Sequence, residues 1–402
     1  MLHSTNNRSL KVSLTQSLVG YMPDGGLCVP DSLPRIPQAF FNNIAEMSLQ
    51  EIAFVVLKMF LCDIFSPEAI KKIVNEVFST DISVKKDTKN RFVIEILKNI
   101  SGKNIGGHFL SALIDHLKES ENISYNIITV VDRNGVDTTT GDCMTCGNQC
   151  VLFPAGEFLS EQITQIAASN ISAVEIDGSL YDCQSLVKDF LMSASATNCS
   201  DTVWISGNSI SFVRGLPYIV CCFHAYARAM ETETVGEDMA IVMLVSDLES
   251  LYMSLIAKKM GLPISKVYVT ETVSNSLNLR GQMSGMTIGT IENLWDSGCV
   301  AKINDLYCGD LKKLQNDIEC YYSDIGSSDS EKYRSIYDTT NITQGAAETK
   351  SVEIMITNDV PNAVKEFPAF LDERCPNQNI GSHRNIIKIP PSLSALMRVL
   401  NI

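Results

Sequence analysis

Residues 173–191 read AVEIDGSLYDCQSLVKDFL, a short apolar run that passes into an amphipathic segment. The run from Ala173 to Ile176 is nearly continuous in apolar residues, as expected of a strand buried on both faces. From Cys183 to Leu191 the apolar residues recur at three and four, which indicates a helix. A buried strand that leads into a helix is the repeating unit of a parallel sheet.

The same alternation extends outward from this segment over residues 124–270. Further short runs have the composition of buried strands, and they are Ile127 to Val131, Val151 to Phe153, Val203 to Ser206 and Ala240 to Val245. Amphipathic segments fall between them, namely Glu161 to Ala168 and Leu248 to Met260. This order predicts an α/β body, with helices on both faces of mainly parallel sheets.

The first 88 residues have a different pattern. Two segments, Leu49 to Phe60 and Pro67 to Phe78, place apolar residues at helical spacing. A turn cluster, Pro23-Asp24-Gly25-Gly26, precedes them. We therefore expect a separate domain over residues 1–88 and the α/β body over residues 89–402.

Composition narrows the classes of partner. The chain has 402 residues, 32 Lys and Arg against 46 Asp and Glu, and a net charge of -14. A negative field of this size repels nucleic acids and anionic membranes, so we expect neither as a partner. The N-terminus lacks an apolar secretory segment, and no run is long enough to span a membrane. We expect a cytoplasmic protein with reduced thiols.

Cysteines form the most conspicuous cluster of metal-binding residue types. Cys143, Cys146 and Cys150 are spaced as metal ligands can be, but a zinc site would need a second pair. Thiols that fill space as small apolar side chains account for the cluster more simply. We therefore predict no metal site, while a function based on metal or thiols stays a minor alternative.

Four segments, in order, are similar to motifs of one enzyme family. They are GYMPDGGLCVP (20–30), IDGSLYDCQSLVK (176–188), GNSISFVR (207–214) and LIAKKMGLP (255–263). They resemble the APDGGLYVP, IDGxFDxCQxLVK, ANSINxxR and LLAKxxGLP segments of threonine synthase, a pyridoxal-phosphate enzyme. The resemblance implies two parallel-sheet subdomains of the tryptophan-synthase-β kind (fold type II), preceded by a helical N-terminal domain.

The resemblance also assigns residues to a cofactor site. The family's catalytic lysine, which holds pyridoxal phosphate as a Schiff base, corresponds to Lys103 within IEILKNISGKNIGGHFL (94–110), followed by Asn104. Burial would lower the pKa of such a lysine and free its amine as nucleophile and base. An ordinary solvated lysine in a glycine-rich turn is the alternative. Thr357, after a predicted strand, corresponds to the threonine beside the pyridine nitrogen.

The implied substrate site has two parts. The family's SGDTG loop, which binds the substrate's anionic end, has two candidate remnants, residues 134–138 and 138–143. The second remnant contributes Thr140, Gly141 and Asp142. Asn208 and Arg214 correspond to the first asparagine and the arginine of the ANSINxxR segment and complete the implied substrate-binding set.

The segment that corresponds to the family's phosphate loop departs from its pattern. Where the family has PSGNFGD, residues 244–250 read LVSDLES, with Asp247 and Glu249 and no glycine. Two carboxylates beside a dianionic phosphate repel it, by roughly 3 kcal/mol per unit-charge pair at about 5 Å and an effective dielectric near 20. As plain residues of a helix N-terminus, the same acids would complement the helix dipole.

Two functional hypotheses follow. The first is a threonine synthase that converts O-phosphohomoserine, a phosphorylated amino acid, to threonine and phosphate with pyridoxal phosphate. The second is a catalytically inactive homologue without the cofactor, acting as a binding or interaction protein. In either case we expect a monomer or a homodimer.

Overall fold

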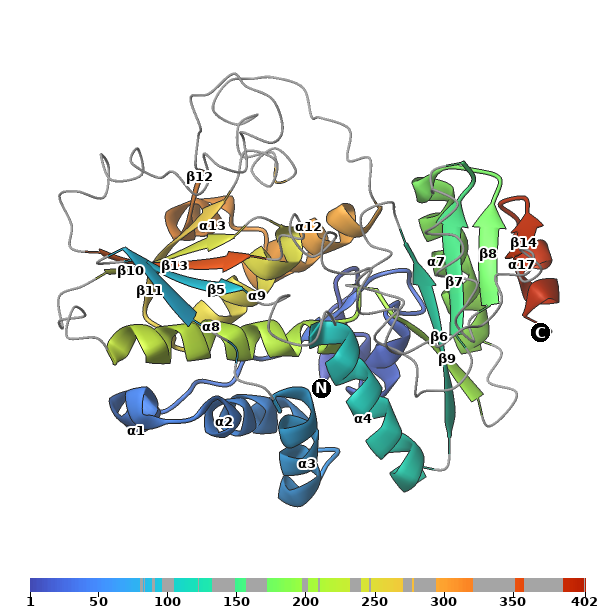
Figure 1. Cartoon of the computed structure of the whole chain (residues 1–402). Helices are drawn as coiled ribbons and strands as arrows, with labels where there is room; N and C mark the ends of the chain where they lie inside the picture. Colours follow the sequence, from blue (N-terminus) through green and yellow to red (C-terminus); the bar gives the residue numbers. More distant parts are fainter. Residues whose placement is uncertain are drawn as a thin grey trace, which may run out of the picture.

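A computed structural model of the chain describes most of its regular structure. The described residues are 1–79, 82, 84–88, 91–95, 105–121, 123–131, 149–156, 172–196, 202–208, 210–231, 240–245, 247–269, 277, 294–320, 351–357, 386–400 and 402. Together they form an N-terminal domain and two sheets with flanking helices (Figure 1).

The N-terminal domain contains a small sheet followed by helices. The described strands pair antiparallel in the order β2-β1-β3, and the helices follow them along the chain. The elements are β1 (Leu2–Ser4), β2 (Lys11–Val12), β3 (Cys28–Pro30), α1 (Gln38–Asn43), α2 (Leu49–Leu61) and α3 (Pro67–Val77). The two predicted helices are therefore confirmed as α2 and α3, and the small sheet is an addition to the helical domain that was expected.

One body sheet is entirely parallel over its described strands, with the order β14-β8-β7-β6-β9. The strands are β6 (Ser124–Val130), β7 (Gln149–Pro154), β8 (Ser172–Ile176), β9 (Thr202–Ser206) and β14 (Ile386–Ile389). We refer to it as the β6–β9 sheet. Its central strands β6 and β7 are buried along almost their whole length, which explains their continuous apolar composition.

The second body sheet has the order β12-β11-β10-β13-β5-β4. Its strands are β4 (Val84–Thr88), β5 (Arg91–Glu95), β10 (Ala240–Val245), β11 (Ile264–Val269), β12 (Ile318–Cys320) and β13 (Ser351–Thr357). All pairs are parallel except β4 with β5. We refer to it as the β10–β13 sheet. The charged sequence VKKDT of β4 is typical of an edge strand, which must not pair further.

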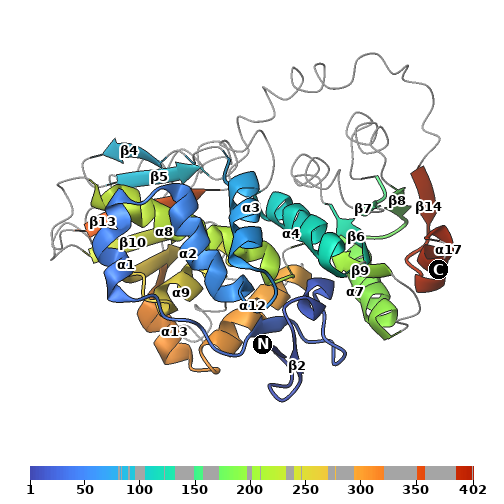
Figure 2. The same ribbon diagram turned by 90° about the horizontal axis from the view of Figure 1, so that it is seen from below.

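Helices cover both body sheets. They are α4 (Ile105–Glu121), α7 (Leu180–Ala196), α8 (Leu216–Met230), α9 (Leu248–Lys259), α12 (Leu294–Leu306), α13 (Leu311–Asp317) and α17 (Leu393–Val399). Helix α8 contacts α2 of the N-terminal domain as well as β5 and β13, and it lies beside α2 in both views (Figures 1 and 2). This central position accounts for its apolar composition. Among the described helices, none has the length and hydropathy to cross a membrane.

The predicted α/β class with two parallel sheets is confirmed. The predicted strands correspond to β6 to β10, and the predicted helices at 183–191 and 248–260 correspond to α7 and α9. The amphipathic segment predicted at 161–168 lies outside the described residues. The domain division between residues 88 and 89 stays a prediction; β4, which ends at Thr88, pairs with β5 of the body.

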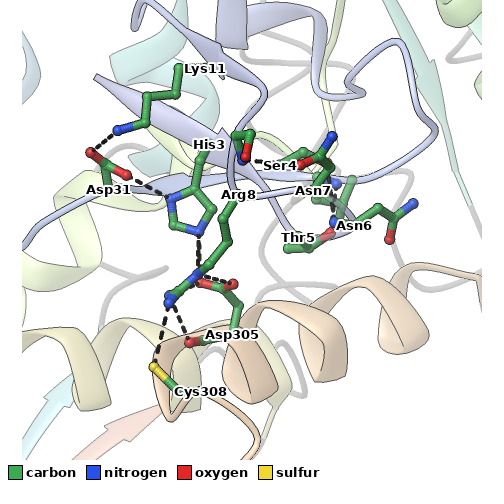
Figure 3. Close-up of polar contacts among 12 residues, drawn as sticks. His3, Ser4, Thr5, Asn6, Asn7, Arg8, Lys11, Asp31, Asp305 and Cys308 are labelled. Carbon is green, nitrogen blue, oxygen red and sulfur yellow. Dashed lines mark hydrogen bonds and ion pairs between the residues drawn. The ribbon is translucent and has the colours of Figure 1, made fainter.

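A polar cluster fixes the N-terminal sheet to the end of α12 (Figure 3). The buried His3 imidazole lies between two carboxylates, with Nδ1 3.5 Å from Asp31 and Nε2 3.0 Å from Asp305. Arg8 donates to both carboxylate oxygens of Asp305, and Lys11 pairs with Asp31 at 2.7 Å. Asp305 belongs to α12, whereas its partners His3 and Arg8 belong to the N-terminal domain. The cluster therefore joins the N-terminal domain to α12.

Candidate functional site

The carboxyl ends of parallel strands are where ligands bind in open α/β sheets. In the β10–β13 sheet, Thr357 is the last residue of β13 and pairs in register with Glu95 of β5. Strand β10 ends at Val245 on the same edge, and α9 begins three residues later. In the β6–β9 sheet, Asn208 follows the end of β9. We take these two edges as the candidate site.

Several predicted site residues lie outside the described residues: Lys103, Asn104, Thr140, Gly141 and Asp142. Their roles stay predictions. Helix α4 begins at Ile105, two residues after Lys103 in the sequence.

Asn208 uses its side-chain amide to hold β6. Its Oδ1 accepts from the backbone N–H of Val130, and its Nδ2 donates to the Val130 carbonyl, both at 3.0 Å. The residue is 8% exposed. These bonds extend the pairing of β6 and β9 past the ends of the strands. Its implied contact with substrate stays a prediction.

Arg214 lies in the short 3-10 helix η3 (Val213–Gly215), directly before α8, and pairs with Glu249 in the first turn of α9. Arg214 Nη1 is 3.6 Å from Glu249 Oε2, and the two side chains are 9% and 16% exposed. The guanidinium follows β9 and the carboxylate follows β10, so the ion pair joins the ends of the two sheets. The predicted substrate-binding arginine and the predicted phosphate loop therefore meet in one place.

Asp247 caps α9. One carboxylate oxygen accepts from the Ser250 backbone N–H and the other from the Ser250 hydroxyl, both at 2.7 Å. The interpretation of Asp247 as an ordinary residue of a helix N-terminus is thus confirmed. A consequence is that the Ser250 N–H, one of the orphan donors at the start of α9, already has an anionic partner.

Glu249 is held in an unusual electrostatic environment. Burial raises the pKa of its carboxyl, and Asp247 raises it further, while the cations Arg214 and Lys302 pull it down without reversing the shift. Its Oε1 is buried and has no hydrogen-bond partner within the described residues. A buried acceptor in that state carries a desolvation cost that no hydrogen bond offsets.

Lys302 of α12 was not identified from the sequence. It is 1% exposed, and burial lowers the pKa of its amine, an effect opposed by Cys299 and Glu249. Its Nζ lies 5.8 Å from the ring centroid of Tyr252, one helical turn beyond Glu249 on α9. A single lysine in a helix gives no sequence signal of such a role, because its burial depends on how α12 packs against α9 and α7.

The cysteine cluster is described only in part. Cys143 and Cys146 lie outside the described residues, and Cys150 is a buried residue of β7 whose thiol has a pKa raised by burial to about 12. The described part of the chain contains no group of three or more potential metal ligands. The prediction that no metal is bound stays a prediction.

Comparisons with known proteins agree on one family. Residues 2–78 match the family model described as the threonine synthase N terminus. Threonine synthase of Pseudomonas aeruginosa is 26% identical over 65% of this chain, and that of Saccharomyces cerevisiae is 25% identical over 68%. The matches span 57% and 58% of those relatives, a little more than half of their length.

Solved structures agree with the sequence relatives. The crystal structure of threonine synthase from Escherichia coli matches over 100% of this chain and 99% of its own, with a TM-score of 0.72 and 18% identity. Threonine synthase from Brucella melitensis with bound pyridoxal phosphate matches over 99% and 98%, with a TM-score of 0.73 and 16% identity. At these identities the solved structures show the fold that this chain shares with them, and the sequence matches show that the chain is similar to threonine synthases over about two thirds of its length.

Proposed function

We propose that this chain is a cytoplasmic threonine synthase, monomeric or homodimeric, that converts O-phosphohomoserine to threonine and inorganic phosphate. The observation that carries the proposal is the retention of the whole scaffold, from the N-terminal domain to both parallel sheets, alongside relatives that bear this name. The implied cofactor is pyridoxal phosphate, which supplies an electron sink for the elimination of phosphate and the addition of water.

The described residues at the start of α9 do not fit the phosphate of that cofactor. Asp247 already accepts from the Ser250 N–H, and Glu249 brings a second carboxylate to the same turn. A phosphate dianion at this turn would meet two anions and would lose an amide donor that such a site needs. We therefore derive no catalytic step through the cofactor, and limit the roles below to residues of the chain.

Within this proposal, Lys103 is the residue that would hold the cofactor and move the substrate's protons. Arg214 would hold an anionic group of the substrate, for which its buried guanidinium is suited. Its present partner is Glu249, so an incoming anion must compete with that carboxylate.

The test is production of threonine and phosphate from O-phosphohomoserine, at saturating pyridoxal phosphate, by wild type and Lys103→Ala. Lys118→Ala is a matched control, because Lys118 of α4 forms only a partly exposed pair with Asp115 at 3.8 Å. We expect turnover by wild type and by Lys118→Ala, and loss of turnover in Lys103→Ala. Equal rates for all three proteins, or no product from any of them, would reject the proposal.

A second candidate is the inactive homologue that acts as a binding or interaction protein. The relatives do not favour it, but one contact does. Arg214, which was expected to bind the substrate, already forms an ion pair with Glu249 of the same chain. Absence of product from wild type at saturating cofactor would support this candidate.

A further inference from the structure

A cavity of about 420 Å³ lies between the N-terminal domain and the C-terminal ends of α9 and α12. Residues 29–33 and Arg35 line it from the N-terminal domain, and Lys258 and Lys259 line it from the last turn of α9. None of the charged side chains at the start of α9 lines it. Lys259 follows Glu249 at about 15 Å along the helix, so the cavity is a separate place in the fold.

The two carboxylates that line this cavity already have partners within the chain, in the polar cluster of Figure 3. Asp31 pairs with Lys11 at 2.7 Å and lies 3.5 Å from His3. Asp305 accepts hydrogen bonds from two nitrogens of the Arg8 guanidinium and lies 3.0 Å from His3. A cationic ligand would have to displace these partners, so the cavity does not favour one.

Two of the cations that line the cavity form no ion pair with any residue that the structure describes. The Arg35 side chain is exposed and makes neither a hydrogen bond nor an ion pair there. The Lys259 ammonium lies 4.1 Å from the ring centroid of Tyr307, which is a cation–π contact. Asp317, which Lys259 attracts at longer range, is paired at 2.7 Å with Lys258 instead. Arg35 and Lys259 therefore remain available to an anion.

The charges around the cavity leave a surplus of positive charge. The cations that line it or pair with its lining are Arg8, Lys11, Arg35, Lys258 and Lys259, and the acids are Asp31, Asp305 and Asp317. With His3 counted as neutral, this is a surplus of two positive charges in a chain whose net charge is -14. A cleft lined by one sign of charge concentrates ligands of the opposite sign. The apolar part of the lining includes Val29, Leu33 and Leu306.

We propose that this cavity binds a small organic dianion, whose acid groups are held by Arg35 and Lys259 and whose carbon skeleton lies against the apolar part of the lining. The ligand class comprises phosphomonoesters and dicarboxylates, because guanidinium and ammonium groups bind both kinds of acid. The volume is within the range of about 300–1,000 Å³ that is usual for small-molecule sites. This site goes beyond the proposed function, because it shares no charged residue with the candidate site.

A ligand in this cavity would contact the N-terminal domain and the body at the same time. The two are already joined beside the cavity, where the Ile36 backbone N–H donates to the Met260 carbonyl at 2.9 Å. A ligand that binds only the folded chain raises its stability in proportion to the logarithm of its concentration. The proposal therefore predicts a rise in Tm with ligand concentration as well as direct binding.

The first experiment is a calorimetric titration of glycerol 2-phosphate, and separately of succinate, into wild type and the double variant Arg35→Gln with Lys259→Gln. The matched control is Arg398→Gln with Lys312→Gln, which removes the same two charges from exposed side chains outside the cavity. We expect the cavity variant to bind with a Kd at least about tenfold higher than wild type, because two ion pairs to the ligand are lost. The control variant should bind as wild type does. The tighter of the two ligands identifies the acid group.

Three results would overturn the proposal: no binding of either ligand by wild type up to about 10 mM, equal affinity in wild type and the cavity variant, or equal binding of the uncharged glycerol and succinamide. Binding that survives in the cavity variant comes from another site, such as the candidate site. If the double variant does not fold, by circular dichroism, Arg35→Gln alone decides, because this exposed side chain makes no contact that its removal would break. It should then weaken binding and reduce the rise in Tm, and values equal to those of wild type would overturn the proposal.

Discussion

Two helices of this chain have a glutamate in their first turn and use it in opposite ways. In α2, Glu51 reaches back to the Ser48 backbone N–H at 2.8 Å while the Ser48 hydroxyl accepts from the Glu51 N–H, which completes a capping box. In α9, Asp247 and Ser250 complete the cap, and Glu249 turns instead toward Arg214. The first glutamate stabilises its own helix, whereas the second compensates a cation of another element.

The pKa values of the two glutamates differ in the same way. Hydrogen bonds from Ser48 lower the pKa of the exposed Glu51, whereas burial raises the pKa of Glu249 despite two nearby cations. A glutamate whose charge is disfavoured by its surroundings is not explained by helix capping. The structural role of Glu249 is therefore its interaction with Arg214 and Lys302, and not the capping of α9.

The largest expected effect comes from removing Arg214. Arg214→Met leaves Glu249 buried without its nearest cation, and breaking a buried pair costs about 3–5 kcal/mol of unfolding free energy. The measurement is urea unfolding followed by circular dichroism. The double variant Arg214→Met with Glu249→Met should recover most of the loss, because it removes both charges. A double variant as unstable as Arg214→Met alone would show that the arginine acts through other contacts.

Removing the caps should have a smaller effect, and it compares the two helices directly. Asp247→Ala removes both acceptors of Ser250, and Ser48→Ala removes the acceptor of the Glu51 N–H. Loss of a cap costs about 0.5–2 kcal/mol, so we expect Asp247→Ala toward the upper end and Ser48→Ala toward the lower end. Urea unfolding of both variants checks the order, and a reversed order would contradict the roles assigned here.

The smallest effect is on the pH dependence of stability. Glu51 has a lowered pKa, so its stabilisation is present above its unfolded value of 4.5 and is lost as the pH falls through the folded value. Glu249 has a raised pKa, so stability decreases as the pH rises above 4.5 through its folded value. The Tm is measured by thermal melts at each pH from 3 to 8. Its dependence on pH should become weaker on the acid side for Glu51→Gln, and weaker above pH 4.5 for Glu249→Gln. The same change of slope in both variants would refute the contrast.

Local sequence patterns predicted part of the scaffold, namely strands β6 to β10 and helices α2, α3, α7 and α9. The runs around Ile128, Leu152 and Val174 are strands because both faces of their sheet are covered, so apolar composition alone marks them. Strand β4 was missed because its lysines and aspartate suit an exposed edge and carry no apolar signal. Asp247 was predicted as a residue of a helix N-terminus, since capping depends on neighbours a few residues away.

The candidate site was much less predictable. Arg214 and Glu249 were both singled out, yet their contact joins segments that follow strands of two different sheets. Lys302 is more distant still, and nothing local distinguishes it from the exposed Lys312 and Lys313. Contacts of this kind depend on how the sheets and helices pack. They can therefore be identified from the three-dimensional structure but not from the local sequence pattern.

The most direct test of the central claim is a titration of pyridoxal phosphate into wild type and Glu249→Gln, read by the visible absorbance that the cofactor gains on binding an enzyme. Pyridoxal, which lacks the phosphate, is the control ligand. Wild type should bind weakly, and Glu249→Gln should bind pyridoxal phosphate about a hundredfold more tightly, from roughly 3 kcal/mol per charge pair, with the larger gain at low salt. Pyridoxal should show no such gain. Tight, salt-insensitive binding of pyridoxal phosphate by the wild type would contradict the claim that Glu249 occupies the place of the phosphate.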